Sequence, residues 1–328
     1  MSNKPKGFYK TTPDSFVVQE VVRSNPPRAV EFSNQSVIRG WEGGPYTVFS
    51  FSKRRWSAEE AMREIGRQLD VRFADISAHG LKDKQAKTSQ HIAVKGNFRP
   101  DFYHPDMNLV QLYGQDKPLI VGDIEGNRFD ITVLSNADEL DLSAALAMPN
   151  IFGTQRLGRY EGSEQVGRLF LEGKPEEAID LMLTIPPAAE NFLRIQELAG
   201  SWERVLAHPE FQFSFKFEIQ KWQSYLWNKL EQELRERLGP GLPDLLPLWS
   251  PDKKVREMYK HLWNPDQLNP RVLNFITYKE RPTTLRPKDF RAEKKLGSWN
   301  FKFDLPSGAY ATVVLAQLFH LEERHINT

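Results

Sequence analysis

The chain has 328 residues, of which 40% are hydrophobic and 27% are charged, and its 44 Lys and Arg residues almost balance 43 Asp and Glu. This composition is typical of a globular protein and excludes wholesale disorder, and the length suggests two domains or one domain with a large insertion. The absence of cysteine excludes disulfides, thiolate catalysis and cysteine-ligated zinc.

The N-terminal part of the chain predicts strands around one helix. Alternating apolar and polar residues predict strands over 14–22 and 46–52. Ser57, with Glu60 three residues later, has the pattern of a capping box and predicts a helix over 57–69. The stretches "ISAHGLKD" and "QHIAVKG" predict two further strands. The loop that contains residue 83 is therefore expected between two strand ends, where functional sites are often built.

The middle of the chain differs from its two ends. A strand is expected over 127–134 and a helix over 141–147, ended by Pro149. From about 174 to 238 the apolar residues recur at helical spacing, and after residue 280 the strand pattern returns, over 297–319. We therefore predict an α+β fold with a mixed, largely antiparallel sheet, and a mainly helical block inserted into this frame.

Basic residues gather in three stretches although the net charge is only +1. They lie in residues 80–99, in residues 279–302 and in "SKRR" at 52–55. Segregated basic patches allow a nearly neutral protein to bind a polyanion through one face. Each cluster by itself is more typical of solvated surface.

Several common motifs are missing from the sequence. There is no GxGxxG opening a helix, no Walker A loop, no HExxH and no GxSxG elbow. His320 and His325 are five residues apart, a poor spacing for metal ligands. No apolar run approaches the ~20 residues that span a bilayer, and the N-terminus lacks an apolar signal core. We expect no metal, nucleotide cofactor or membrane partner, and a soluble, cytoplasmic monomer.

The stretch "GLKDKQAKTSQ", residues 80–90, holds one carboxylate among lysines. Asp83 lies between Lys82 and Lys84, and Lys87 follows. Such an acid is most often a turn residue that caps backbone N–H groups. The neighbouring positive charges favour its ionised form, which serves as nucleophile, general base or electrostatic stabiliser.

A second stretch, "MPNIFGTQRLG" at 148–158, has two interpretations. Phe152 is either a core residue or a ring that stacks on a planar substrate, an interaction of ~1–3 kcal/mol per base. In the second interpretation, Asn150 hydrogen-bonds nearby and Arg156 binds a phosphate. Spacing alone favours the core interpretation.

Together, these two stretches resemble motifs of the TruD-type tRNA pseudouridine synthases. "YKTTPDSFVVQE", "GNRF" at 126–129, "QSYLWN" at 223–228 and "LPSGAYAT" at 305–312 resemble further family motifs in the same order. The resemblance implies a pseudouridine synthase catalytic domain over 1–173 and 281–328, and a mainly helical α+β TRUD insertion domain over 174–280. It also implies isomerisation of uridine to pseudouridine in tRNA, at position 13 in bacterial relatives, without cofactor or metal.

The resemblance also assigns roles to individual residues. Asp83 matches the catalytic aspartate, Lys10 the N-terminal lysine near the active site, and Phe152 the aromatic that stacks on the flipped base. Asn150 matches the asparagine that helps to fix the site. Lys82, Lys84 and Lys87 are then expected to face RNA phosphates, where each contact adds salt-dependent affinity.

Two other classes of function also fit the basic patches. A non-catalytic RNA-binding module explains the lysines but not an acid among them, because an acid there weakens phosphate binding. A nucleoside glycosidase normally uses two carboxylates, and Glu20 is the acid that could approach Asp83. Within the leading hypothesis, attack at C1′, attack at C6 and a glycal-like route all remain open.

Overall fold

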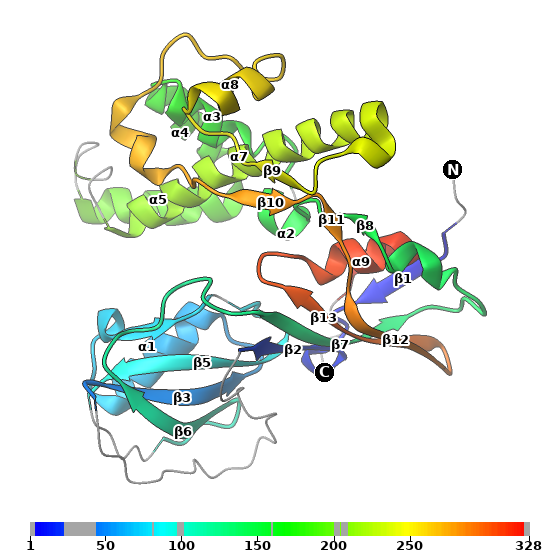
Figure 1. Cartoon of the computed structure of the whole chain (residues 1–328). Coiled ribbons are helices and arrows are strands. Elements are labelled where there is room, and N and C mark those ends of the chain that lie inside the picture. Colours follow the sequence, from blue (N-terminus) through cyan, green and yellow to red (C-terminus); the bar gives the residue numbers. More distant parts are fainter. Residues whose placement is uncertain are drawn as a thin grey trace. The chain divides into compact units, whose positions relative to one another are not determined.

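The computed structural model describes residues 4–22, 44–80, 82–96, 102–158, 160–199, 204 and 209–324 (Figure 1). The chain divides into two compact units. The first unit comprises Met1–Met148 and Arg286–Thr328, and the second comprises Pro149–Leu285. The insertion expected over 174–280 falls inside the second unit, and its boundaries stay a prediction.

Among the described residues, the first unit contains a ten-stranded sheet whose main path runs β12-β13-β7-β2-β5-β3-β6. Its strands are β1 Lys6–Tyr9, β2 Phe16–Val21, β3 Tyr46–Lys53, β4 Ile76–Ala78, β5 Lys87–Lys95, β6 Met107–Gln115, β7 Gly126–Leu134, β12 Lys288–Lys295, β13 Ser298–Pro306 and β14 His320–Glu323. The pairs β2–β5 and β1–β14 are parallel, and the other pairs described in this sheet are antiparallel. The predicted α+β class with a mixed, largely antiparallel sheet is confirmed.

Helix α1, Ala58–Leu69, begins where the capping box predicts. The Ser57 hydroxyl accepts the backbone N–H of Glu60, and the Glu60 carboxylate accepts the backbone N–H of Ser57. The apolar face of α1 packs on side chains of β3 and β5, with Ile65, Phe51 and Ile92 fully buried. This packing fixes β3 and β5 against the helix.

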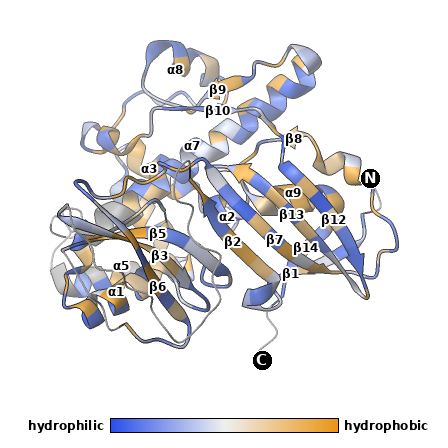
Figure 2. Cartoon of the chain, turned by 60° about the horizontal axis from the view of Figure 1, so that its bottom comes forward, coloured by the Kyte–Doolittle hydropathy of each residue, from blue (hydrophilic) through white to orange (hydrophobic). Residues whose placement is uncertain are grey.

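Aromatic rings line the other half of the sheet. The ring of Phe129 on β7 lies 6.4 Å from Phe16 on β2 and 5.5 Å from Phe303 on β13, measured between centroids. These three neighbouring strands each carry both hydrophobic and hydrophilic residues (Figure 2). Their buried faces form a core that holds β2, and with it Glu20, in the centre of the sheet.

One expectation from the sequence is wrong, and another holds only for a shorter segment. Residues Ala311–Leu318 form helix α9 rather than a strand. Its Val313, Val314, Leu315 and Leu318 are all buried, so apolar residues occur around most of the helix and no helical period stands out. A helix does form where one is expected over 141–147, but it is a short 3₁₀ helix, Leu142–Ala145, with Asp141 at its N-cap.

The second unit is mainly helical. Its helices are α2 Thr154–Leu157, α3 Gln165–Leu171, α4 Pro175–Leu183, α5 Pro186–Ala199, α7 Pro209–Leu238 and α8 Lys253–Tyr259, and its short strands are β9 Leu245–Pro247, β10 Glu280–Pro282 and β11 Thr284–Leu285. Strand β9 pairs with β10, and β11 pairs with β8, Met148–Pro149. A core that includes Trp222, Trp249, Tyr259 and Trp263 joins helices α3, α4, α5, α7 and α8. Within the described residues, no helix is long and apolar enough to cross a membrane.

Candidate active site

The motif "GLKDKQAKTSQ" forms the connection between β4 and β5 and the first residues of β5. Strand β5 runs parallel to β2, with Lys87 opposite Val17, and antiparallel to β3, with Thr88 opposite Lys53. The side chain of Gln90 donates to the carbonyl of Gly80 at 3.3 Å, across the base of this loop. The loop that carries Asp83 therefore lies at the ends of three neighbouring strands, β2, β5 and β3.

Lys10, the residue after β1, forms an ion pair with Asp83. Its ammonium lies 2.8 Å from a carboxylate oxygen of Asp83, and the lysine side chain is only 6% exposed whereas the aspartate side chain is 41% exposed. The ammonium also lies 5.1 Å from the centroid of the Phe16 ring, within cation–π range. Lys10 has a φ of 54°, which is uncommon for a residue with a side chain. Such conformations concentrate at functional sites, where the surrounding structure holds them.

The side chain of Glu20 on β2 is buried and contacts the loop that carries Asp83. One of its carboxylate oxygens accepts the Lys82 ammonium at 2.9 Å, and the other accepts the backbone N–H of His91 at 2.9 Å. The side chain of Lys82 is 10% exposed. The structure therefore brings Glu20 to the residue next to Asp83, and the buried ion pair argues against a phosphate contact by Lys82.

A third lysine, which the sequence placed in a surface cluster, lies in the same site. Lys53 is the last residue of β3 and is fully buried, and its ammonium donates to the backbone carbonyl of Asp83 at 2.8 Å. Burial lowers the pKa of Lys53 to about 8; the charge of Asp83 opposes this shift. The signal that could have found Lys53 is the run "TVFSFSK", in which the polar residues that alternate with apolar ones are small hydroxyl residues, and these are buried in the structure.

The remaining lysines of the motif, Lys84 and Lys87, are more exposed to solvent than Lys82. Lys84 pairs with Glu60 on α1 at 3.0 Å, with both side chains about half exposed. Lys87 pairs with Asp14 at 3.4 Å. Both pairs are at least partly exposed to solvent, and such screened pairs are weak enough for a phosphate to replace the carboxylate.

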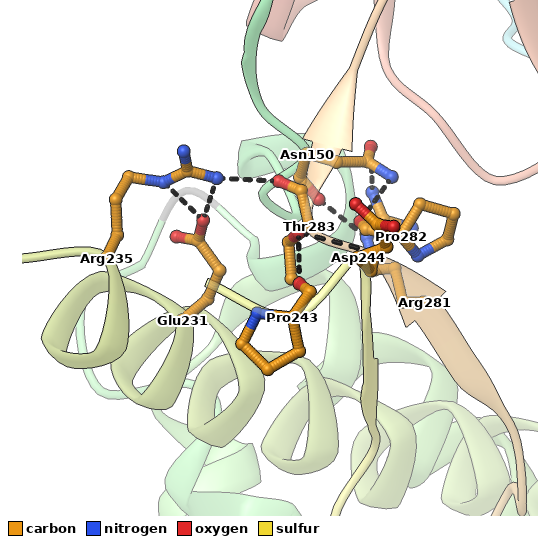
Figure 3. A network of polar contacts seen from close by, with 8 residues as sticks. All are labelled: Asn150, Glu231, Arg235, Pro243, Asp244, Arg281, Pro282 and Thr283. Atoms are coloured by element: carbon orange, nitrogen blue, oxygen red, sulfur yellow. Dashed lines mark hydrogen bonds and ion pairs between the residues drawn. The ribbon is translucent and has the colours of Figure 1, made fainter. Parts of the chain in front are cut away.

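In the second unit, Asn150 belongs to a buried polar network (Figure 3). Arg281 donates from Nε to the backbone carbonyl of Asn150 at 2.6 Å and from Nη2 to its side-chain oxygen at 2.9 Å. The side-chain NH₂ of Asn150 donates to the carbonyl of Pro282 at 3.0 Å. This network fixes the chain that leads into Phe152.

Phe152 is 7% exposed and is held on several sides. Its backbone N–H and carbonyl bond the side-chain amide of Asn228 at 2.8 and 2.9 Å. The guanidinium of Arg281 lies 4.0 Å from the ring centroid, and Trp227 contacts the ring edge-on. The ring is thus packed in this structure, and stacking on a base requires a neighbouring side chain to move.

Arg156 lies on α2 in the second unit. Its Nη2 donates to Gln220 at 2.7 Å, and its guanidinium lies 4.9 Å from the centroid of the partly exposed Phe217 ring. Arg156 also lowers the pKa of Lys279, for which burial is the larger cause.

Comparison with known proteins decides the family. The family model described as "tRNA pseudouridine synthase D (TruD)" matches residues 2–206. This chain belongs to the TruD family. Curated relatives include "Probable tRNA pseudouridine synthase D" of Pyrococcus abyssi, 25% identical over 95% of this chain and 96% of the relative. The "tRNA pseudouridine synthase D" of Aquifex aeolicus is also 25% identical, over 85% of this chain and 92% of the relative.

A solved structure supports the same fold. The crystal structure of a Methanosarcina mazei protein, described as TruD, superposes with a TM-score of 0.58 and covers 97% of this chain and 94% of the other. The two sequences are 22% identical. The resemblance to TruD-type proteins and the predicted fold class are both confirmed.

Proposed function

We propose that this TruD-family chain isomerises uridine to pseudouridine in tRNA, at position 13, with Asp83 as the catalytic carboxylate. The observation that carries the proposal is the ion pair between Asp83 and Lys10, in which a half-exposed carboxylate is held by a buried ammonium. An aspartate that merely capped a turn would need no such partner. The names of the two relatives above, both of which contain "tRNA pseudouridine synthase D", support the substrate class.

The reaction conserves all atoms of the nucleotide. The N1–C1′ bond breaks, a C5–C1′ bond forms, the proton on C5 leaves and N1 gains a proton. Attack at C1′, attack at C6 and elimination to a glycal-like intermediate all use a carboxylate as nucleophile or base. The exposed side of Asp83 would face the sugar, while the Lys10 hydrogen bond fixes its orientation.

The target base has to leave its stack before it can react, at a cost of a few kcal/mol. In the proposal, Phe152 stacks on the flipped uracil once Arg281 or Trp227 yields space, and Asn150 holds the Phe152 main chain. Lys84, Lys87 and Arg156 contact phosphates. Lys82 and Glu20 act together as a buried support for the Asp83 loop.

The glycosidase alternative is less well supported. It requires a second carboxylate that faces the scissile bond or a water. Both carboxylate oxygens of Glu20 already accept hydrogen bonds, and its side chain is fully buried. A role in positioning Lys82 suits Glu20 better than catalysis.

The test uses tRNA transcripts labelled with tritium at C5 of uridine. Release of tritium reports loss of the C5 proton, and digestion of the product separates pseudouridine from free uracil. We expect wild-type protein to release tritium from a transcript with uridine at position 13 and not from one with cytidine there. Asp83→Asn should bind tRNA and release no tritium. Free uracil as product, or turnover by the Asn variant, would overturn the proposal.

A further inference from the structure

Lys53 is a charged residue in a place that ordinarily excludes charge. Its side chain has no exposed surface, although Lys is almost never fully buried unless it is paired. The backbone partners of Lys53 across the sheet are Thr88 on β5 and Met107 on β6. Its ammonium extends to the backbone carbonyl of Asp83, the residue proposed to perform catalysis.

The bond from Lys53 goes to the main chain of Asp83, whereas Lys10 binds the carboxylate of the same residue. Two ammonium groups from β3 and from the residue after β1 therefore hold one aspartate at two points. A hydrogen bond to the main chain limits movement of the loop, and a bond to the carboxylate limits rotation of the side chain. Both are needed to keep a reacting oxygen in place.

A neutral donor could satisfy the same carbonyl at a lower cost in free energy. Burial lowers the pKa of Lys53 to about 8; Asp83 and Glu60 raise it and Lys82 lowers it. Beyond these, Lys10 faces the Asp83 carboxylate and Lys84 faces Glu60. The fold thus keeps a cation in a desolvated position, which is difficult to explain by stability alone.

We propose that Lys53 is a positioning residue whose buried positive charge fixes the Asp83 loop in its reactive arrangement. This inference rests on the proposed function, because it assumes that Asp83 performs the reaction. It assigns a role to a residue outside the motif that carries Asp83.

The role of Lys53 predicts an alkaline limit to activity. As pH rises through about 8, the Lys53 ammonium loses its proton, and the neutral amine is a weaker donor with no charge. Arginine keeps its proton over this range. Lys53→Arg should therefore retain activity at a pH where the wild-type rate has fallen.

The experiment measures kcat and KM for tRNA by tritium release, from about pH 6.5 to about pH 9.5, together with the unfolding temperature. For Lys53→Met we expect kcat to fall at least about tenfold, with KM for tRNA within about twofold and no lower unfolding temperature at pH 7. Lys53→Arg should recover most of the kcat lost in the Met variant and lack the alkaline fall. Lys260→Met, an exposed lysine on the second unit, is the matched control and should behave as wild type.

The outcomes separate this inference from the function on which it rests. Absence of pseudouridine with wild-type protein removes the proposed function. Turnover by wild type with an equal kcat for Lys53→Met removes only the role of Lys53. A Met variant that fails to fold, or an alkaline fall that is the same in Lys53→Arg as in wild type, also overturns the positioning role.

Discussion

The ammonium of Lys10 lies 2.8 Å from the carboxylate of Asp83, which is 73 residues further along the chain. The lysine is buried and the aspartate is partly exposed, so one side of the carboxylate is fixed and another side is open to a substrate. A buried donor that orients a partly exposed acceptor is the arrangement expected of a preorganised reactive group.

Replacing Lys10 with Met should impair catalysis and leave the fold intact. The substitution keeps an unbranched side chain but removes the ammonium, and with it both the bond that orients Asp83 and the cation–π contact with Phe16. We expect kcat in the tritium assay to fall by about 10–100-fold, since misorientation of a reacting group costs that much. The control is Lys6→Met on β1, whose exposed pair with Glu322 contributes little. A wild-type rate for Lys10→Met would show that the ion pair does not serve catalysis.

Lys53→Met should make the protein more stable at neutral pH. The pKa of Lys53 is lowered from 10.5 to about 8 in the folded state, so between these values the unfolded chain binds more protons than the folded one. The cost of the buried ammonium is therefore fully present below pH 8 and disappears as pH rises toward 10.5. We expect Lys53→Met to raise the free energy of unfolding by about 1–3 kcal/mol at neutral pH, and by less at alkaline pH. Urea titrations at both pH values check this, and a less stable variant at neutral pH would contradict it.

Phe152→Leu should slow the reaction if the ring stacks on uracil. Leucine keeps most of the apolar volume, so the loss of stability should stay below about 1.5 kcal/mol. The lost stacking, ~1–3 kcal/mol, corresponds to a fall in kcat/KM of about 5–150-fold. The assay uses full-length tRNA and saturating as well as limiting substrate. An unchanged kcat/KM would assign Phe152 to the core of the second unit alone.

Arg281→Lys should destabilise the second unit. The Arg281 guanidinium donates hydrogen bonds to both the backbone carbonyl and the side-chain oxygen of Asn150, and it lies over the Phe152 ring. A lysine ammonium is not planar and cannot make the same two-pronged hydrogen bond or stack on the ring. We expect a loss of about 2–4 kcal/mol in urea unfolding. Arg271→Lys, the same change at an exposed position, should alter stability by less than about 0.5 kcal/mol. Equal midpoints for the two variants would mean that the network in Figure 3 contributes little.

Ser57→Ala should weaken helix α1 through its N-terminus. The hydroxyl accepts the Glu60 N–H, and the loss of such a cap costs about 1 kcal/mol. Ser57→Asp, which can accept the same bond, should restore stability. Thermal unfolding of the three proteins gives the comparison, and an alanine variant as stable as wild type would show that water replaces the cap.

Local sequence signals predicted the elements that frame the site. The capping box placed the start of α1, and alternation placed β2, β3 and β7, because side-chain periods of 3.6 and 2 follow from backbone geometry alone. Helix α9 does not show the 3.6-residue period of apolar side chains, because most of its surface is buried, and its sequence therefore predicts a strand. The family motifs pointed to Asp83 and Lys10 without any three-dimensional information.

Which lysine pairs with which acid depended on the tertiary structure. By sequence, Lys82 and Lys53 are both members of basic clusters, and either could face a phosphate. The strand order β2-β5-β3 instead gives each lysine a protein partner. Lys82 binds the buried carboxylate of Glu20, and Lys53, at the end of β3, binds the carbonyl of Asp83. The sequence gives the type of each residue and its position along the chain. The strength of an ion pair depends on the distance between its charges and on their burial, and both are set only when strands distant in sequence become neighbours.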